Sequence, residues 1–419
     1  MGKTIAEKIL SSHSNTDCYA NDFIVANIDF MFSPDSNRPQ AYQMFEEMGG
    51  KEVFDKNKIV HINDHHPSSP NENYANHQKG IRAFAKKHGL KLYDNGDGVC
   101  HSLIPQEGHV VPGDLVIGSD SHTTTYGALN AFSTGVGSSD LAAAMISGKL
   151  WFKVPESMKI IFSGTLQDGV YSKDLILYVL KKISAKGALY QSIEFTGDVV
   201  RKLSIDARLT ISNVAIEAGA KAAIMECDEK LEKWIKERAK KDQINPVFPD
   251  KDAKYSEIID INVTDISPQI ACPHQVDNVK SIEVIDDTKI TKAIVGTCTN
   301  GRLEDIRIVA NILEGKKVQP GVQMFVTPAT REIYKEAIKE GYIETIISSG
   351  ANIGIPGCSG CTGSSFCGVP GDNENVISTA NRNFIGRLGN AKANIYLASP
   401  ATVAASAISG KISDCREYL

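Results

Sequence analysis

The sequence has no long apolar run, no surplus of positive charge and few cysteines. No segment approaches the roughly 18 consecutive apolar residues of a membrane-spanning helix. The net charge of −5 is opposite in sign to the basic surface of nucleic-acid-binding proteins. The N-terminal segment MGKTIAEKIL lacks the layout of a signal peptide, and Ala6 does not fit the myristoylation pattern. We therefore expect a cytoplasmic protein that binds neither nucleic acid nor membranes.

Nine cysteines in 419 residues are too few for a disulfide scaffold. Five of them are scattered along the chain, and we expect these to be buried small hydrophobic residues or ordinary surface thiols: Cys18, Cys100, Cys227, Cys272 and Cys415. The other four lie in the last third of the chain. Three of these, discussed below, have the spacing and the surroundings of metal ligands.

Strand and helix patterns alternate along the chain, which predicts an α/β fold with largely parallel sheets. A short β-branched run such as Ile24–Ile28 predicts a buried strand, and a helix is expected to begin after a cap at Ser212. The length exceeds that of one ordinary core. We predict three α/β/α domains, at residues 1–152, 153–285 and 286–419.

Several loops that follow predicted strands carry pairs of acidic and histidine residues. Such loops, at the carboxyl ends of parallel strands, are where α/β enzymes build their sites. An aspartate beside a histidine can fix the imidazole tautomer and tune it for acid–base work. The candidates in these loops are Asp64, His65, His66, His101, Asp120, Ser121 and His122.

Two further groups of polar residues are site candidates because the acidic and histidine residues of these loops occur in the same chain. Asn213 and Glu217 are four positions apart and would share one face of a helix. The segment TANRNFIGRLGN contains Asn381, Arg382 and Arg387, and two arginines beside a glycine turn suit a bidentate grip on carboxylates. Taken alone, each group would equally suit a solvated surface.

The strongest local signal is a set of three cysteines. Cys298 follows a predicted strand, and Cys358 and Cys361 form a CxxC in a glycine-rich loop. A structural zinc site has four closed ligands, and an electron-transfer cluster has a ligand on every iron. Three thiolates on a 4Fe–4S cluster leave one iron open to act as a Lewis acid. Cys367 remains a possible fourth ligand of a closed site, whereas a thioredoxin-like use of the CxxC is disfavoured by its position in the chain.

Taken together, these segments resemble the aconitase superfamily, in particular the large subunits of the two-subunit 3-isopropylmalate dehydratase and homoaconitase type. The resemblance covers essentially the whole chain. It rests on six motifs in family order: DHH at Asp64, IGSDSHT at Ile117, TISNVAIEAGA at Thr210, GTCTNGR at Gly296, PGCSGC at Pro356 and NRNFIGR at Asn381. After Cys361, the segment TGSSFCGVPGDNEN departs from the family pattern.

The resemblance implies three α/β domains around a central 4Fe–4S cluster in which one iron has no protein ligand. The implied cluster ligands are Cys298, Cys358 and Cys361. The implied acid–imidazole pairs are Asp64 with His65, Asp120 with His101, and Glu217 with His122. The implied substrate-binding residues are Ser121, Asn213, Asn381, Arg382 and Arg387. The implied reaction is the reversible dehydration and hydration of a small hydroxy di- or tricarboxylic acid.

The family's carbon base is a serine on a mobile domain that has no counterpart before Leu419. The resemblance therefore implies a separate small subunit that carries this domain. We expect 3-isopropylmalate, of leucine biosynthesis, as the substrate, with homoaconitate or a dimethylmalate-type acid as alternatives. From other classes, an RNA-binding paralogue and a closed-cluster electron carrier remain as remote alternatives. The sequence alone settles neither the substrate nor the stoichiometry of the two subunits.

Overall fold

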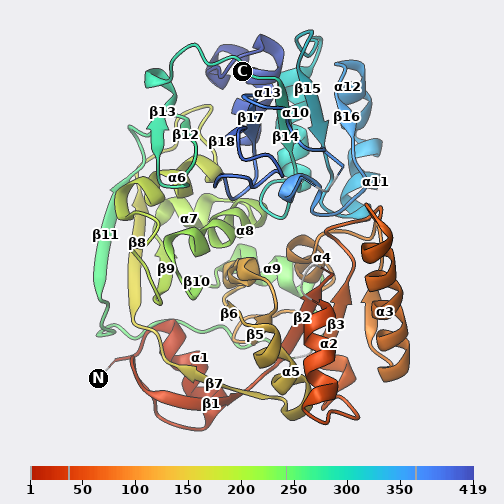
Figure 1. Cartoon of the computed structure of the whole chain (residues 1–419). Coiled ribbons are helices and arrows are strands. Elements are labelled where there is room, and N and C mark those ends of the chain that lie inside the picture. Colours follow the sequence, from red (N-terminus) through yellow and green to blue (C-terminus); the bar gives the residue numbers. More distant parts are fainter. Residues whose placement is uncertain (1, 36–37, 242, 364–365) are drawn as a thin grey trace.

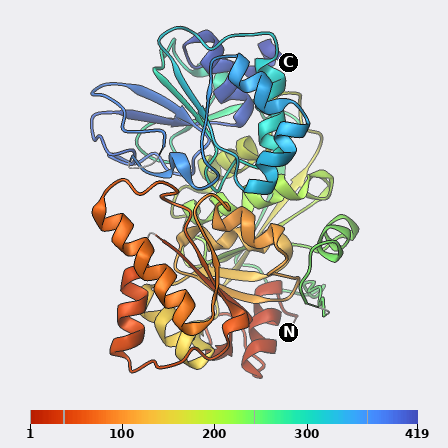
Figure 2. The same ribbon diagram turned by 90° about the vertical axis from the view of Figure 1, so that its right-hand side faces the viewer.

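The computed structural model describes residues 2–35, 38–241, 243–363 and 366–419. The strands of these residues form one small ribbon and three larger, mostly parallel sheets. Figure 1 shows the five-stranded sheet at the bottom, the seven-stranded sheet at the top and the four-stranded sheet between them on the left. The turned view in Figure 2 shows that the N-terminal and C-terminal parts lie at opposite ends of the molecule.

The five-stranded sheet has the order β4-β3-β2-β5-β6, and every neighbouring pair is parallel. The central strands β2, β3 and β5 are buried along their whole length, as expected where helices cover both faces. The strands are β2 (Phe30–Pro34), β3 (Ile59–Ile62), β4 (Lys91–Tyr93), β5 (Leu115–Gly118) and β6 (Phe132–Gly135). The helices of this region are α1 (Ile5–Ser14), α2 (Arg38–Glu47), α3 (Glu72–His88), α4 (Cys100–Gln106) and α5 (Ser138–Ser147), with 3-10 turns η1 (Lys56–Lys58) and η2 (Ser121–Leu129).

The four-stranded sheet is parallel throughout, in the order β10-β9-β8-β11. Its strands are β8 (Ser157–Ser163), β9 (Ser192–Thr196), β10 (Ala222–Met225) and β11 (Glu257–Asn262). Its helices are α6 (Ser172–Ile183), α7 (Asp198–Lys202), α8 (Ile205–Val214) and α9 (Glu229–Lys236), with the 3-10 turn η3 (Ala215–Ala218). This sheet packs against the five-stranded sheet through η2. A Cβ on Gly127 of η2 would lie 1.9 Å from the carbonyl oxygen of Ala223, so only glycine fits there.

The seven-stranded sheet has the order β13-β12-β18-β17-β14-β15-β16, and among the described residues its antiparallel pairs are the two that β12 forms with β13 and with β18. Its strands are β12 (Gln269–Ala271), β13 (Val279–Ser281), β14 (Lys292–Val295), β15 (Gln323–Val326), β16 (Asn352–Ile353), β17 (Asn375–Ser378) and β18 (Asn394–Leu397). Its helices are α10 (Leu303–Leu313), α11 (Arg331–Lys339), α12 (Tyr342–Ser348) and α13 (Pro400–Ser409), with turns η4 (Ile282–Val284), η5 (Ser359–Cys361) and η6 (Cys415–Tyr418).

The α/β class and the largely parallel sheets are as the sequence predicts. The domain boundaries stay predictions, and we note that β12 and β13 pair within the seven-stranded sheet although they precede residue 286. The strand expected near Ile24–Ile28 is β1 (Phe23–Asn27), which is not a fully buried strand. It forms an antiparallel ribbon with β7 (Lys149–Lys153), so alternate residues such as Phe23 and Val25 are exposed. No helix in the described ranges is long and apolar enough to span a membrane.

The helix expected to begin after Ser212 begins instead at Ile205, with Ser204 as its cap. The hydroxyl of Ser204 accepts the backbone N–H of Ala207 over 3.0 Å, whereas Ser212 is buried and donates to the carbonyl oxygen of Ala223. Helix α8 ends at Val214, so Asn213 and Glu217 do not share one regular helix. Glu217 lies in the following 3-10 turn, η3.

Candidate active site

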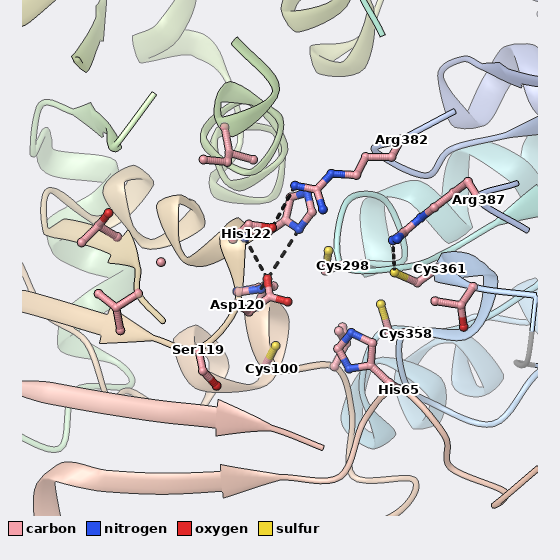
Figure 3. A pocket seen from close by; sticks show the side chains of 18 of the residues that line it. His65, Cys100, Ser119, Asp120, His122, Cys298, Cys358, Cys361, Arg382 and Arg387 are labelled. Carbon is pink, nitrogen blue, oxygen red and sulfur yellow. Dashed lines mark hydrogen bonds and ion pairs between the residues drawn. The ribbon is translucent and has the colours of Figure 1, made fainter. Parts of the chain in front are cut away.

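A cavity of about 510 Å³ lies where the three large sheets meet, and it is lined by loops that follow their strands (Figure 3). Ten of the predicted site residues line it: His65, His101, Asp120, Ser121, His122, Cys298, Cys358, Cys361, Arg382 and Arg387. The other four stand behind these and contact them: Asp64, Asn213, Glu217 and Asn381. The fold thus brings all fourteen residues to one place.

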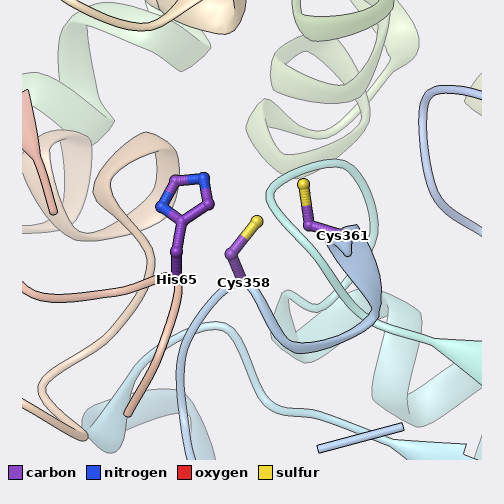
Figure 4. A group of neighbouring side chains, drawn as sticks. All are labelled: His65, Cys358 and Cys361. Carbon is purple, nitrogen blue, oxygen red and sulfur yellow. The ribbon is translucent and has the colours of Figure 1, made fainter. Parts of the chain in front are cut away.

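Three cysteine sulfurs face this cavity from two loops of the seven-stranded sheet. Cys298 follows β14, and Cys358 and Cys361 flank the turn η5, where the N–H of Cys361 donates to the carbonyl oxygen of Cys358. The thiol of Cys358 hydrogen-bonds with the sulfurs of both Cys298 and Cys361. The sulfurs of Cys358 and Cys361 and a ring nitrogen of His65 all lie within 4.8 Å of one another (Figure 4). These side chains are suited to binding one metal centre together.

The loop that carries the CxxC is fastened to the loop that carries Asp64. The N–H of Cys358 donates to the carbonyl oxygen of Asp64 over 2.8 Å. Gly357 has a φ of +157°, and a Cβ there would lie 2.6 Å from the same carbonyl oxygen. Glycine is therefore required for this close approach between two loops that are far apart in the sequence.

Hydrogen-bond donors surround two of the sulfurs. Asn213 and Asn381 approach Cys298 Sγ with their amide nitrogens at 3.5 and 3.3 Å, and Arg387 donates to Cys361 Sγ over 2.7 Å. The hydrogen bonds with Cys358 lower the pKa of Cys298 to about 5 and also lower the pKa of Cys361, whereas the same contacts raise the pKa of Cys358, so the three sulfurs share protons until a metal displaces them. Metal ligands must be thiolates. The donor set therefore fits an iron–sulfur cluster.

Cys367 does not line the cavity. It is buried in the core beside Ile294 and Val376, and its Sγ lies 3.5 Å from the hydroxyl of Ser359. Burial raises the pKa of Cys367 to about 11, which keeps the thiol protonated. Residues 364–365 of the same segment lie outside the described ranges. In this geometry Cys367 is a core residue and not a fourth ligand.

The first acid–imidazole pair lies next to the cysteines. Oδ1 of Asp64 is 2.7 Å from Nδ1 of His65, and its Oδ2 accepts the backbone N–H of Cys100 over 2.8 Å. Asp35 accepts the backbone N–H of His65 over 3.0 Å. Burial disfavours a charged imidazole here, yet the charges and hydrogen bonds of Asp64 and Asp35 raise the pKa of His65 well above its usual value.

The other two pairs form one chain that starts at Asp120, the cap of η2. Its Oδ1 lies 2.8 Å from Nε2 of His101 and also accepts the backbone N–H of His122. On the far side, Nε2 of His122 lies 2.9 Å from Oε1 of Glu217. Burial acts to lower the pKa of His122, but hydrogen bonds to Asp120 and Glu217 raise it to about 10. His122 is therefore held as a cation at neutral pH.

Arg382 connects the third sheet to this chain. Its Nε donates to Oε1 of Glu217 over 2.8 Å, and its terminal nitrogen donates to the hydroxyl of Ser121 over 2.9 Å. Arg387, five residues further along the same segment, reaches the cavity beside Cys361 (Figure 3). Two guanidinium groups on one small cavity suit a ligand with more than one carboxylate.

Some residues of the site were not found from the sequence. Cys100 was expected to be a buried small hydrophobic residue or an ordinary surface thiol; it is buried, but it also lines the cavity, and its backbone N–H binds Asp64. Its position directly before His101 in the chain was an available signal. Tyr126 Oη lies 3.2 Å from Nδ1 of His101, and Lys221 and Ile216 also line the cavity. Ile216 lies inside the motif TISNVAIEAGA, Lys221 directly follows it, and Tyr126 lies just after IGSDSHT, so the motifs were the available signal for all three.

Known proteins with similar sequences or a similar fold were compared with this chain. The curated proteins it resembles include the 3-isopropylmalate dehydratase large subunit of Thermoanaerobacter sp., 48% identical over 98% of both chains. They also include the 3-isopropylmalate dehydratase large subunit 1 of Methanopyrus kandleri, 45% identical over the full length of both. Among solved structures, the aconitase X of Thermococcus kodakaraensis shares the fold, with a TM-score of 0.51 at 13% identity over 90% of this chain and 88% of that one.

The family model of the aconitase family (aconitate hydratase) matches residues 7–410, which is nearly the whole chain. The match includes every loop that lines the cavity. Together with relatives that are 45–48% identical over essentially their full length, it identifies the family. The chain belongs to the aconitase family.

Proposed function

We propose that this chain is the large, catalytic subunit of a hydro-lyase that reversibly dehydrates 3-isopropylmalate. The observation that carries the proposal is one cavity in which three buried cysteine sulfurs meet acid–imidazole pairs and two arginines. The names of the full-length relatives support the same reaction and substrate. Removal of hydroxide from a hydroxy acid requires an acid at the leaving oxygen, a base at the neighbouring carbon and a grip on the carboxylates.

Cys298, Cys358 and Cys361 would hold a 4Fe–4S cluster. When bound with one iron free of protein ligands, such a cluster supplies a Lewis acid for the substrate hydroxyl. The arrangement of the sulfurs supports three ligands and not four, because Cys367 lies in the core. The amides of Asn213 and Asn381 would orient Cys298 through their contacts with its sulfur.

The chain's own residues would bind the substrate and supply the proton. Arg382 and Arg387 would bind carboxylates, with Ser121 holding the Arg382 guanidinium in place. His65, whose pKa is raised by Asp64 and Asp35, would carry the proton on its Nε2 to the departing hydroxyl. His101 and His122 also line the cavity, but their ring nitrogens face Asp120, Tyr126 and Glu217, so they would act on the substrate and the released water through this chain of hydrogen bonds.

We propose that the base that removes the carbon-bound proton is a serine of a separate small subunit with a mobile domain. The serines in the cavity lining have other partners: Ser119 pairs with Ser33 over 2.8 Å, and Ser121 accepts from Arg382. The relatives are named as large subunits, which supports a small-subunit partner.

The test is to produce the chain together with its small subunit and to follow the ultraviolet absorbance of the unsaturated product. The panel is 3-isopropylmalate, homocitrate and dimethylmalate, with the Cys358→Ala complex as the inactive control. The highest kcat/KM is expected for 3-isopropylmalate, and the large chain alone should be almost inactive. Preference for another acid would overturn the substrate, and full activity of the single chain would overturn the partner.

The open iron has its own spectroscopic test. Mild oxidation of a cluster with three cysteine ligands is expected to release one iron and to give the electron paramagnetic resonance signal of a 3Fe–4S cluster. Added ferrous iron should convert it back. A fully loaded cluster that never shows this signal would instead indicate four protein ligands.

A further inference from the structure

Lys173, near the start of α6, is a buried charge that the proposed function leaves unexplained. Its side chain is fully buried, and its ammonium donates to the carbonyl oxygens of Thr379 and Ala380 over 2.9 and 2.6 Å. Within the described residues it forms no ion pair. The adjacent carboxylate of Asp174 accepts instead the backbone N–H groups of Tyr171 and Gln269.

Stability does not explain a lysine in this position. Burial of an ammonium without a carboxylate partner costs free energy, and the positive end of the helix dipole at the start of α6 adds to that cost. Burial lowers the pKa of Lys173 to about 7, and the strongest influence in the opposite direction is the charge of Cys298. An apolar side chain of similar length would avoid the cost of the buried charge but would leave the carbonyl oxygens of Thr379 and Ala380 without this donor.

The two carbonyl groups that Lys173 binds belong to the segment that carries the substrate-binding residues. Thr379 and Ala380 directly precede Asn381, whose amide reaches Cys298 Sγ, and Arg382, which reaches Glu217 and Ser121. The hydroxyl of Thr379 also accepts the backbone N–H of Gly296, two residues before Cys298. The segment is thus held between α6 and the loop of the first cluster cysteine.

We propose that Lys173 is a positioning residue of the active site, which fixes residues 379–382 against the loop of Cys298 and, when protonated, adds positive charge on the side of the cavity where Cys298 lies. The inference rests on the proposed function, because it assigns the three cysteine sulfurs to an iron–sulfur cluster. Its mechanical part concerns the chain alone. If Thr379 and Ala380 lose their partner, the Asn381 amide and the Arg382 guanidinium lose their fixed approach to the cavity.

Two substitutions separate the two effects, and a third is a matched control. Lys173→Met removes the charge and the donors, whereas Lys173→Gln removes the charge and keeps an amide donor for the carbonyl groups. Lys292 is also buried and donates to a single carbonyl oxygen, that of Cys367, over 2.8 Å. Since Cys367 does not line the cavity, Lys292→Met removes a contact of the same kind away from the substrate-binding residues.

In the metal-free chain, amide hydrogen exchange of residues 379–387 is expected to be faster in Lys173→Met than in the wild type or in Lys292→Met. The thermal unfolding midpoints of Lys173→Met and Lys292→Met are measured beside it, so that a general loss of stability can be told from a local change in residues 379–387. This measurement needs no cluster. Unchanged exchange in residues 379–387 would overturn the positioning role even if the proposed function holds, and lower stability without altered exchange would reduce Lys173 to a structural residue.

The charge is tested on the chain loaded anaerobically with ferrous iron and sulfide. The cluster midpoint potential should be more negative in both Lys173→Met and Lys173→Gln, because a nearby cation stabilises the reduced cluster. In the complex with the small subunit, KM is expected to rise about tenfold in Lys173→Met, less in Lys173→Gln, with a smaller change in kcat. Unchanged potentials and KM would overturn the proposal, whereas a wild-type chain that binds no iron and sulfide would overturn the proposed function and leave the exchange test valid.

Discussion

Oε1 of Glu217 lies 2.9 Å from Nε2 of His122, and this contact joins η3 of the four-stranded sheet to η2 of the five-stranded sheet. The same carboxylate oxygen accepts the Nε–H of Arg382 from the seven-stranded sheet. One oxygen atom thus connects the three large sheets at the wall of the cavity. A substitution at Glu217 should therefore change both the pKa of His122 and the position of the Arg382 guanidinium.

Glu217→Gln is expected to lower kcat/KM about 100-fold, within the range for loss of a group that supports acid–base catalysis. The neutral amide removes one of the two hydrogen bonds that raise the pKa of His122, so that pKa falls from about 10. His122 then loses its proton at lower pH, and the alkaline limb of the kcat/KM profile moves to lower pH. The control is Glu229→Gln, on the exposed start of α9. An unchanged alkaline limb would contradict a charged role for His122.

Tyr126→Phe tests how His101 is held. Nε2 of His101 lies 2.8 Å from the carboxylate of Asp120, and its Nδ1 lies 3.2 Å from the phenol oxygen of Tyr126, whose O–H donates to the carbonyl oxygen of Cys100 over 3.4 Å. Without that hydroxyl, kcat should fall about three- to tenfold with little change in KM, which matches the loss of one neutral hydrogen bond. Steady-state kinetics of the complex give the answer, with Tyr334→Phe on α11 as control. A change in KM alone would indicate that Tyr126 shapes the cavity and does not orient His101.

The local pairs were predictable from sequence, and the distant ones were predictable only through the family resemblance. Asp64 and His65 are neighbours in the chain, so their contact requires little of the fold. His122 and Glu217 are 95 positions apart and meet because two sheets pack through η2. No periodic pattern carries that information.

The start of α8, which the sequence analysis placed after Ser212, shows a second limit of prediction from sequence. Ser204 and Ser212 are both plausible caps by residue type, and only burial separates them, because Ser212 donates to Ala223 within the core. Cys100 and Lys173 show a third limit. Each lies in an ordinary helical segment, and its role depends on what tertiary packing places beside it: Asp64 for one and the 379–380 carbonyl groups for the other.

Cys358→Ala and Cys367→Ala distinguish an open site from a closed one. After anaerobic loading, the Cys358→Ala chain is expected to retain little iron and sulfide, since it loses one of three ligands. Cys367→Ala should bind as much as the wild type and should unfold with a loss of about 1 kcal/mol, because a small buried side chain becomes smaller. Chemical analysis of iron and sulfide per chain and visible absorbance measure both. Equal losses of iron and sulfide in the two variants would indicate that Cys367 is a cluster ligand.

The pair His13–Asp29 gives a pH-dependent prediction that is independent of the active site. His13 Nε2 binds the Asp29 carboxylate, and both side chains are largely buried. Burial opposes both charges, yet the hydrogen bond and the mutual attraction raise the pKa of His13 above 6.5 and lower that of Asp29 below 3.8. The contribution of Asp29 to the free energy of unfolding is present above pH 3.8 and is lost as the pH falls through its lowered pKa. The contribution of His13 is present below pH 6.5 and is lost as the pH rises through its raised pKa.

His13→Gln is therefore expected to lower the free energy of unfolding by about 1 to 2 kcal/mol near pH ~5.5, where both groups are charged. The difference from the wild type should shrink at pH ~9, because the contribution of the charged His13 is lost as the pH rises through its raised pKa. Urea unfolding of the metal-free chain at the two pH values measures it, with the exposed His77→Gln as control. A difference that stays constant between the two pH values would mean that His13 acts through packing, and that its charge adds nothing to the stability of the fold.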